Sequence, residues 1–291
     1  MDYQISEVDF TDKEIDLKIR KLLQAAYNSN DLIDEFYVKR NISLRGNTNK
    51  SIFLVAHNGD EFIGCNGFIG NTFFLDGISR LCFQSCWSGT HPDHQRKGIF
   101  VNIQKKAETI LSQRGAGMIF GLPNDNSRPI FVHKLDFLER DCNYVQIPSF
   151  LFLKFFINDK TFMTSNAGHI EADEKEVYML KNNLRSGLLE FKVNDSYLWG
   201  KIATKNFLKI KIKYFDIGGM NIKEASDLER IFSKLKALNV AYFQFTSCAI
   251  NRHNILFRHW RKSSNNPFIF KFLNFPKSDN INISLGAIDV F

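Results

Sequence analysis

The sequence of 291 residues has no apolar run of membrane-spanning length, which would need about 20 consecutive apolar residues. Its densest apolar stretch, residues 149–157, has the length of a strand and is interrupted by Lys154. The segment Met1–Glu7 lacks the basic start and apolar core of a signal peptide. We therefore expect a cytoplasmic protein with no membrane partner.

Cysteine is sparse and odd in number, which argues against a disulfide framework. The five cysteines are scattered along the chain at Cys65, Cys82, Cys86, Cys142 and Cys248. The first three fall in strand-like segments, where a free thiol behaves as a small apolar side chain. Six prolines and 17 glycines give no low-complexity signal. The pattern favours a folded protein of a reducing compartment.

Positive charge is in excess only in the second half. The net charge is +7, with 17 basic and 18 acidic residues in 1–145 but 21 and 13 in 146–291. A basic surplus attracts phosphates, nucleic acids or acidic membranes, or it is an ordinary solvated surface. The basic half contains no recognisable nucleic-acid motif. We therefore expect no nucleic-acid partner, and a phosphate-bearing small molecule suits the charge.

Hydrophobic periodicity and turn residues predict the elements of the first half. A capping box at Thr11–Glu14 predicts a helix with apolar positions from Ile15 to Ala26. The other predicted elements are a helix over 32–40, strands over 51–57 and 61–70 joined by a turn at Asn58–Gly59, a strand over 81–89, a helix from Ile99 stopped by Gly115, and a strand over 118–122.

The second half repeats this order of elements after a polar connector near 166–175. It predicts a strand with apolar residues alternating from Leu208 to Tyr214, a helix over 222–238, a strand over 241–248 and a helix after Asn251. The fold class is therefore α/β (α+β), with a mixed, mostly antiparallel sheet flanked by helices. We expect two domains, 1–147 and 148–291. The second is a degenerate copy of the first, because it has no counterpart of the glycine-containing loop around Gly98.

The segment Thr90–Phe100 reads Thr-His-Pro-Asp-His-Gln-Arg-Lys-Gly-Ile-Phe and lies directly before a predicted helix. A helix N-terminus presents unpaired N–H groups and partial positive charge. Glycine at the tightest point, Gly98, leaves room for an anion, and Arg96 and Lys97 add charge. The alternatives are a helix-entry loop with a chance glycine, or a zinc site using His91, His94 and Cys86.

The run Gln95–Phe100 resembles the pyrophosphate loop Gln/Arg-x-x-Gly-x-Gly/Ala of the GNAT superfamily of N-acyltransferases, preceded by a similar His-Pro-Asp-x. Phe100 stands where that family has a small residue. The stretch Gly121–Phe137 resembles the segment in which an asparagine and a serine begin a helix that ends in Lys-Leu-Gly-Phe. Asp136 replaces that glycine, and aspartate tolerates a left-handed turn.

The resemblance covers residues 50–145 and implies a GNAT fold that binds acyl-CoA, acetyl or longer, as co-substrate without a metal. It implies that two strands splay to admit the pantetheine arm and that Asn126 and Ser127 cap the next helix. The implied coenzyme-binding residues are Thr90, Gln95, Arg96, Lys97, Gly98, Ile99, Phe100, Asn124, Asn126, Ser127 and Phe131.

The same resemblance implies direct attack of an amine on the thioester, with backbone N–H groups near Ser88 and Thr90 as oxyanion donors. The family's thiolate-protonating tyrosine corresponds to Val132, and its glutamate base falls near Gln84. His57, His91 and Asp76 are weak base candidates, and each also fits a structural or solvated role. A water relay, or an acceptor already partly neutral, would serve instead.

The acceptor side resembles a bacterial branch that acylates nucleotide-linked amino sugars for surface polysaccharides such as O-antigen and lipopolysaccharide. Tyr197 and Trp199 resemble part of that branch's Tyr-Leu-x-Trp-Arg-Tyr box, although core packing also explains them. With Arg80 and Gln84 they are the expected acceptor-binding residues, in a monomer or homodimer. The alternatives are an aminoacyl-tRNA-dependent peptidyl transferase of the FemABX type, an acetyltransferase of lysine or aminoglycosides, and a non-catalytic binding module.

Overall fold

The computed structural model describes residues 2–28, 50–75, 78–140, 143–151, 170–184, 187–246, 261–263, 267–277 and 281–282. The predicted helices over 32–40 and after Asn251 lie outside these residues, as do Asp76, Cys142 and Cys248. The chain divides into two compact units, one of residues 1–73, 79–140 and 268–277, the other of 74–78, 141–267 and 278–291.

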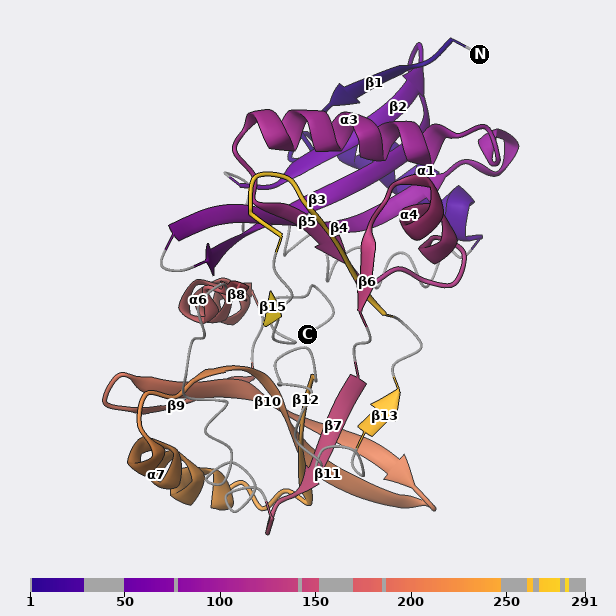
Figure 1. The fold of residues 1–291 in the computed structure, drawn as a ribbon. Helices are drawn as coiled ribbons and strands as arrows, with labels where there is room; N and C mark the ends of the chain where they lie inside the picture. Colours follow the sequence, from indigo (N-terminus) through magenta and orange to yellow (C-terminus); the bar gives the residue numbers. More distant parts are fainter. Residues whose placement is uncertain are drawn as a thin grey trace. The chain divides into compact units, whose positions relative to one another are not determined.

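The first unit contains a sheet in the order β1-β2-β3-β4-β5-β14-β6 (Figure 1). All neighbouring strands with described registers are antiparallel except β4 and β5. The strands are β1 (Gln4–Glu7), β2 (Ile52–Asn58), β3 (Glu61–Leu75), β4 (Ile78–Thr90), β5 (Met118–Gly121), β14 (Phe268–Phe272) and β6 (Leu138–Arg140).

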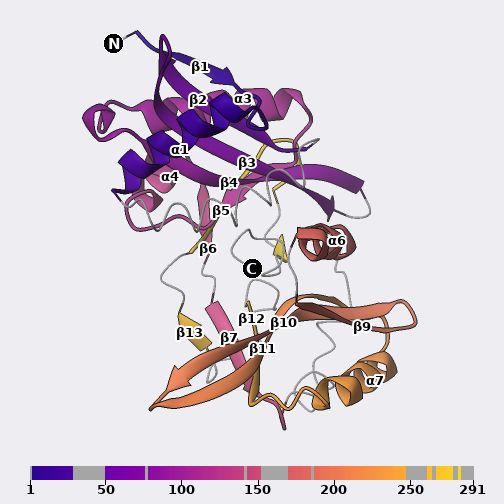
Figure 2. The ribbon, with the colours of Figure 1, turned by 180° about the vertical axis from the view of Figure 1, so that it is seen from behind.

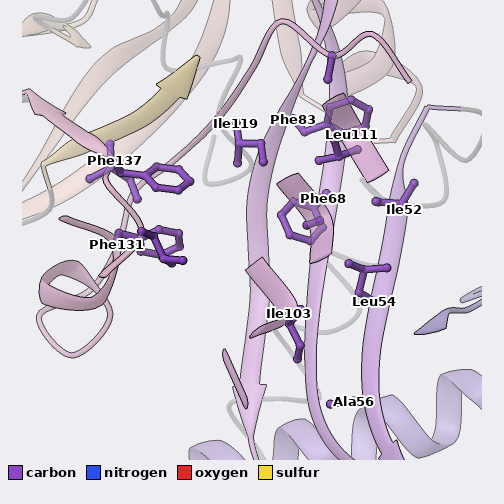
Figure 3. Close-up of a cluster of buried hydrophobic side chains, with 14 of the residues drawn as sticks. Ile52, Leu54, Ala56, Phe68, Phe83, Ile103, Leu111, Ile119, Phe131 and Phe137 are labelled. Atoms are coloured by element: carbon purple, nitrogen blue, oxygen red, sulfur yellow. The ribbon is translucent and has the colours of Figure 1, made fainter. Parts of the chain in front are cut away.

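Two long helices cover opposite faces of this sheet, as the two views show (Figures 1 and 2). The helix α1 (Lys13–Tyr27) buries Ile19, Leu22 and Leu23 against one face. The helix α3 (Ile99–Gln113) buries Ile103 and Leu111 against the other, beside Leu54, Phe68 and Phe83 of the strands (Figure 3). Side chains alternate between the faces of a strand, so each core receives every second residue.

The turns predicted at Gly59 and Gly115 in the first unit are confirmed. Gly59 turns the hairpin between β2 and β3 with φ 57°, and Gly115 follows α3 with φ 77°. The predicted capping box is wrong in detail, because the side chain of Asp12 accepts the N–H groups of Glu14 and Ile15. Thr11 donates to Asp9 instead.

The second unit contains a sheet in the order β13-β7-β12-β11-β10-β9. Here too one neighbouring pair, β11 and β12, is parallel, and the pairs on either side of it are antiparallel. The strands are β7 (Asn143–Pro148), β9 (Leu188–Val193), β10 (Ser196–Phe207), β11 (Ile210–Asn221), β12 (Tyr242–Thr246) and β13 (Arg261–Ser263). The short strands β8 (Ile170–Ala172) and β15 (Ile281–Asn282) pair with each other in parallel.

The helix α7 (Ala225–Lys236) packs Leu228, Ile231, Phe232 and Leu235 onto one face of the second sheet, and α6 (Glu174–Leu184) is the other described helix of this unit. The helix predicted over 222–238 is thus confirmed, with shorter ends. The strand predicted from Leu208 begins later, because Leu208 has φ 47° and belongs to the turn between β10 and β11.

The two sheets share one arrangement in which a strand from a distant part of the chain completes each sheet. In both, an antiparallel hairpin leads to a parallel pair, and an antiparallel strand lies beyond it. In the first sheet that strand is β14, from near the end of the chain, and in the second it is β7, which directly follows β6. The second half therefore repeats the first in topology, and each sheet contains a strand that its sequence neighbours do not supply.

Candidate functional site

The strands β4 and β5 diverge within the first sheet. Their ladder consists of the pairs Phe83–Ile119 and Gln84–Phe120. Among the described residues, β5 ends one position later at Gly121, while β4 continues through Ser85 to Thr90. Backbone N–H and C=O groups at such a divergence suit an extended ligand that carries amide groups, which can pair as an added strand does.

The backbone of β4 is distorted where it passes this divergence. Trp87 has φ 56°, a left-handed conformation that is an outlier for a bulky residue. The sequence gives no signal for it, because nothing in the local residues favours this conformation. Such strain persists only where surrounding contacts enforce it, and it gathers at functional sites.

Side chains from β3 and α1 hold the distorted peptides in place. The Cys65 thiol lies 3.5 Å from the Trp87 carbonyl oxygen, and the Tyr27 hydroxyl donates to the Ser88 carbonyl over 2.7 Å. Since N–H and C=O point in opposite directions across a trans peptide, the Ser88 N–H points away from Cys65. Burial raises the Cys65 thiol pKa to about 12, although a backbone hydrogen bond with Gly89 lowers it. The thiol therefore stays neutral and is no nucleophile.

The loop after β4 forms an open cradle of N–H groups at the start of α3. Gly98 is the N-cap residue with φ 77°, no side chain caps the helix, and a Cβ at this position would meet nothing within 4 Å. Arg96 has φ 61°, so two left-handed residues flank Lys97. Alternating backbone conformations of this kind direct successive N–H groups to one point, where an anion binds.

Loop side chains brace this cradle and leave positive charge beside it. The Lys97 ammonium donates to the Asp93 carbonyl over 2.6 Å, and the Gln95 amide lies 3.5 Å from the Thr90 carbonyl. The short helix η1 (Pro92–His94) lies between Thr90 and Gln95 in the sequence. The His94 Nδ1 is buried without a hydrogen-bond partner in the part of the chain that the structure describes.

Phe100 turns away from the cradle and into the core. Its ring meets Phe131 edge-on at 5.3 Å between centroids, and Phe131 in turn meets Phe137 at 4.9 Å. This large residue therefore packs α3 against α4 (Arg128–Lys134) instead of filling the space at the loop. Ile99 is likewise buried and anchors the first turn of α3.

The turn that leads into α4 is held by a different side chain from those predicted. The Asn124 carboxamide oxygen accepts the N–H groups of Asn126 and Ser127 and also the Ser127 hydroxyl, at 2.9–3.1 Å. Ser127 is the N-cap residue of α4, as expected, but the expected capping by the Asn126 and Ser127 side chains is wrong, because Asn124 makes these hydrogen bonds instead. The turn after α4 is as expected, with Asp136 at φ 57°.

The candidate bases lie in ordinary surroundings or outside the described residues. The His57 Nε2 lies 2.7 Å from the Ser6 hydroxyl of β1, and its Nδ1 lies 3.0 Å from the Gly59 carbonyl of the hairpin turn, so both ring nitrogens have structural partners. Gln84 is buried in β4, and Arg80 is exposed near its start. Asp76 lies outside the described residues. Within the described residues, no group of three or more His, Cys, Asp or Glu side chains is placed to hold a metal ion.

In the second unit Trp199 is a core residue. It is fully buried, its ring meets Tyr178 at 5.6 Å, and a Cβ on Gly218 would collide with it. Tyr197, two residues earlier on β10, is half-buried. Core packing, the alternative interpretation of this pair, accounts for Trp199.

The second sheet also carries a polar row in direct register across four strands, namely Lys201, Asp216, Gln244 and Gln146. Gln146 donates to Gln244 over 2.7 Å, and Gln244 donates to Asp216 over 3.2 Å. Burial raises the Asp216 pKa to about 6, while the charge of Lys201 and the hydrogen bond from Gln244 lower it. Periodicity did not reveal this row, because its members lie far apart in the sequence.

Among the described residues no helix is long and apolar enough to cross a membrane. Residues 9–137 match the family model of an acetyltransferase (GNAT) domain. No curated protein matches the sequence.

Solved structures share the fold over both halves of the chain. A conserved protein of Enterococcus faecalis V583, described as a probable N-acyltransferase, has 10% identity and a TM-score of 0.61, covering 94% of this chain and 73% of its own. A GCN5-related N-acetyltransferase of Anabaena variabilis has 9% identity, a TM-score of 0.61 and the same coverage. Eis1 of Mycobacterium abscessus has 11% identity and a TM-score of 0.55, covering 93% and 73%.

Proposed function

Because residues 9–137 match the family model of an acetyltransferase (GNAT) domain, we propose that this protein transfers an acyl group from acyl-CoA to the amine of a nucleotide-linked amino sugar. One observation carries the coenzyme part of the proposal. The open cradle at Gly98 lies at the C-terminal end of β4, the strand that diverges from β5. A pyrophosphate with an amide-bearing arm is the chemistry that such a cradle and such a divergence accept together.

In this proposal the coenzyme pyrophosphate binds the N–H groups around Gly98, beside the positive charge of Arg96 and Lys97. The pantetheine arm runs along β4 and pairs with its backbone from Thr90 to about Ser88, and the acyl chain extends from there toward Ser85. Gln95 keeps the loop in shape through Thr90. Asn124, Asn126, Ser127 and Phe131 line the far side through the start of α4, with the Asn124 side chain making the hydrogen bonds of the turn.

The reaction is direct transfer within a ternary complex. The neutral acceptor amine attacks the thioester carbon, a C–N bond forms, the C–S bond breaks, and the sulfur leaves as a thiolate. The amine nitrogen releases a proton, and the thiolate takes one up. The Ser88 N–H stabilises the oxyanion, with the Thr90 N–H as a second candidate donor. We assign the proton transfers to water, because both ring nitrogens of His57 have partners, Ser6 on β1 and Gly59 in the hairpin turn.

The acceptor half of the proposal rests on charge. Residues 146–291 contain 21 basic and 13 acidic side chains, which favours a diphosphate-bearing acceptor over a cationic one. We propose that residues 148–291 supply part of the acceptor contacts, with Tyr197 the more accessible of the two predicted aromatic residues. Arg80 and Gln84 are the candidates from β4.

A thiol-release assay tests the proposal as a whole. The enzyme is offered acetyl-CoA and longer acyl-CoAs with a panel of nucleotide-linked amino sugars and the corresponding free sugars. We expect thiol release only with amino sugars and a higher kcat/KM when the nucleotide is present. Equal kcat/KM with and without the nucleotide would refute the acceptor assignment and leave the coenzyme assignment standing.

A further inference from the structure

Three polar side chains meet inside the otherwise apolar core between α3 and the first sheet. They are Asn66 on β3, Ser85 on β4 and Gln104 on α3. The amide nitrogens of Asn66 and Gln104 each lie 3.1 Å from the Ser85 hydroxyl oxygen. Asn66 and Gln104 are fully buried, and Gln104 interrupts a helix face whose other buried members are apolar or alanine.

Ser85 stands where β4 and β5 part. It is the first residue of β4 after the last pair of the ladder, and it is half-buried between the buried residues Gln84 and Cys86. The residue across from it on β5 is Gly121, where an added Cβ would lie 3.3 Å from the Ser85 carbonyl oxygen. A ligand that extends along β4 beyond the paired residues therefore meets Ser85 first, and the buried Gln104 amide lies directly behind the Ser85 hydroxyl.

One polar atom of the Gln104 amide has no hydrogen-bond partner among the described residues. This atom is the buried Oε1. Exchanging the amide oxygen and nitrogen lets the oxygen accept from Ser85 but leaves the nitrogen unmet instead. A buried polar group without a partner is costly, so the site calls for a group that both donates and accepts. A hydroxyl group suits either orientation of the Gln104 amide, because it can donate to the amide oxygen or accept from the amide nitrogen.

We propose that this polar trio, Asn66, Ser85 and Gln104, binds a hydroxyl group on the acyl chain, so that the donor substrate is a short hydroxyacyl-CoA. The inference rests on the proposed function, because it takes the coenzyme arm to lie along β4. The acyl chain is the part of the ligand beyond the arm, and it is therefore the part that reaches Ser85. A purely aliphatic chain would leave this buried amide atom without a hydrogen-bond partner.

Equilibrium binding tests this without knowledge of the acceptor. The full chain is titrated calorimetrically with 3-hydroxybutyryl-CoA, butyryl-CoA and free CoA. We expect 3-hydroxybutyryl-CoA to bind about 10-fold more tightly than butyryl-CoA, the effect of one hydrogen bond to a buried group. In Gln104→Met and in Ser85→Ala the ratio should fall to about 1. Gln113→Met, at an exposed glutamine of the same helix, should keep the wild-type ratio.

Each other result overturns a distinct part. Equal affinity of wild type for the two acyl-CoAs overturns the hydroxyacyl inference but leaves coenzyme binding intact. If Gln104→Met weakens the affinity for all three ligands equally, with an unchanged melting temperature, the trio contacts the pantetheine arm and not the acyl chain. This result overturns the inference. If Gln104→Met does not fold, an unchanged ratio in Ser85→Ala overturns it. Failure of wild type to bind any CoA ligand overturns the proposed function itself.

Discussion

The Lys271 ammonium lies 2.8 Å from a carboxylate oxygen of Glu108 and 2.8 Å from the Leu135 carbonyl oxygen. Lys271 belongs to β14, Glu108 to α3, and Leu135 ends α4. One side chain from near the end of the chain therefore joins the two helices α3 and α4. The pair is largely buried, since 25% of the lysine side chain and 17% of the glutamate are exposed.

Removing this lysine should destabilise the first unit. In Lys271→Met the Glu108 carboxylate keeps its burial but loses its counter-charge, and we expect a loss of about 1–3 kcal/mol in the free energy of unfolding. Urea denaturation measures it. The double variant Lys271→Met with Glu108→Leu should be more stable than Lys271→Met alone, because no carboxylate is left unpaired. Additive losses from the two substitutions would count against the pairing.

The first unit should depend on the strand that completes its sheet. The backbone N–H groups of Leu273, Asn274 and Phe275 all lie within 3.2 Å of the Gly117 carbonyl, and β14 fills the place between β5 and β6. A chain ending at Pro267 exposes an edge of β5 and should lose cooperative unfolding and CoA binding. A chain ending at Lys277 retains β14 and is the matched control. Equal CoA affinity of the two chains would contradict the dependence.

A charge at the cradle should abolish CoA binding. Gly98→Asp places a carboxylate beside the pyrophosphate, and we expect at least about 100-fold weaker binding of CoA by calorimetry. Gly98→Asn has nearly the same shape and tolerates the left-handed backbone, so it isolates the charge. We expect a much smaller loss for Asn than for Asp. Unchanged affinity in Gly98→Asp would remove the loop from the coenzyme site.

The sequence was most informative where the structure is decided locally. Gly59, Gly98 and Gly115 all take positive φ at the turns expected of them, and Asp136 tolerates the turn after α4. These positions follow from the conformational freedom of single residues. The apolar spacing of α3 likewise fixes which face meets the sheet.

What the sequence could not predict depends on tertiary contacts. The placement of β14 beside β5 rests on pairing across about half the chain, for which no local pattern exists. The left-handed Trp87 is imposed by its neighbours against its own preference. At the start of α4, Asn124, Asn126 and Ser127 all suit a cap, and only the backbone path decides that Asn124 serves.

The Tyr27 hydroxyl should matter for turnover more than for coenzyme binding. It holds the Ser88 carbonyl next to the distorted Trp87, so Tyr27→Phe frees that peptide to reorient. We expect kcat to fall about 3-fold to 10-fold, with the Kd for CoA changed less than 2-fold, as for loss of one hydrogen bond. The matched control is Tyr3→Phe, whose hydroxyl contacts Asn102 on α3. A parallel change in kcat and Kd would mean that Tyr27 supports the binding site as a whole.

Asp216 should make the stability of the protein depend on pH. Burial raises its pKa from the ordinary value of 3.8 to about 6, so the folded state binds this proton more tightly than the unfolded chain does. The stabilisation is therefore complete below about pH 4 and is lost as the pH rises through about 6. A shift of about two units corresponds to about 3 kcal/mol. Asp216→Asn does not titrate and should lack this dependence.

Urea denaturation of wild type and Asp216→Asn between pH 4 and pH 8 isolates the effect, because every other titrating group is shared and cancels in the difference. The free energy of unfolding of wild type should decline relative to the variant by about 3 kcal/mol across this range. Asp195→Asn, at an exposed aspartate of the same unit, should follow wild type. Parallel curves for wild type and Asp216→Asn would mean that Lys201 and Gln244 compensate the charge, and that Asp216 stays ionised throughout the range.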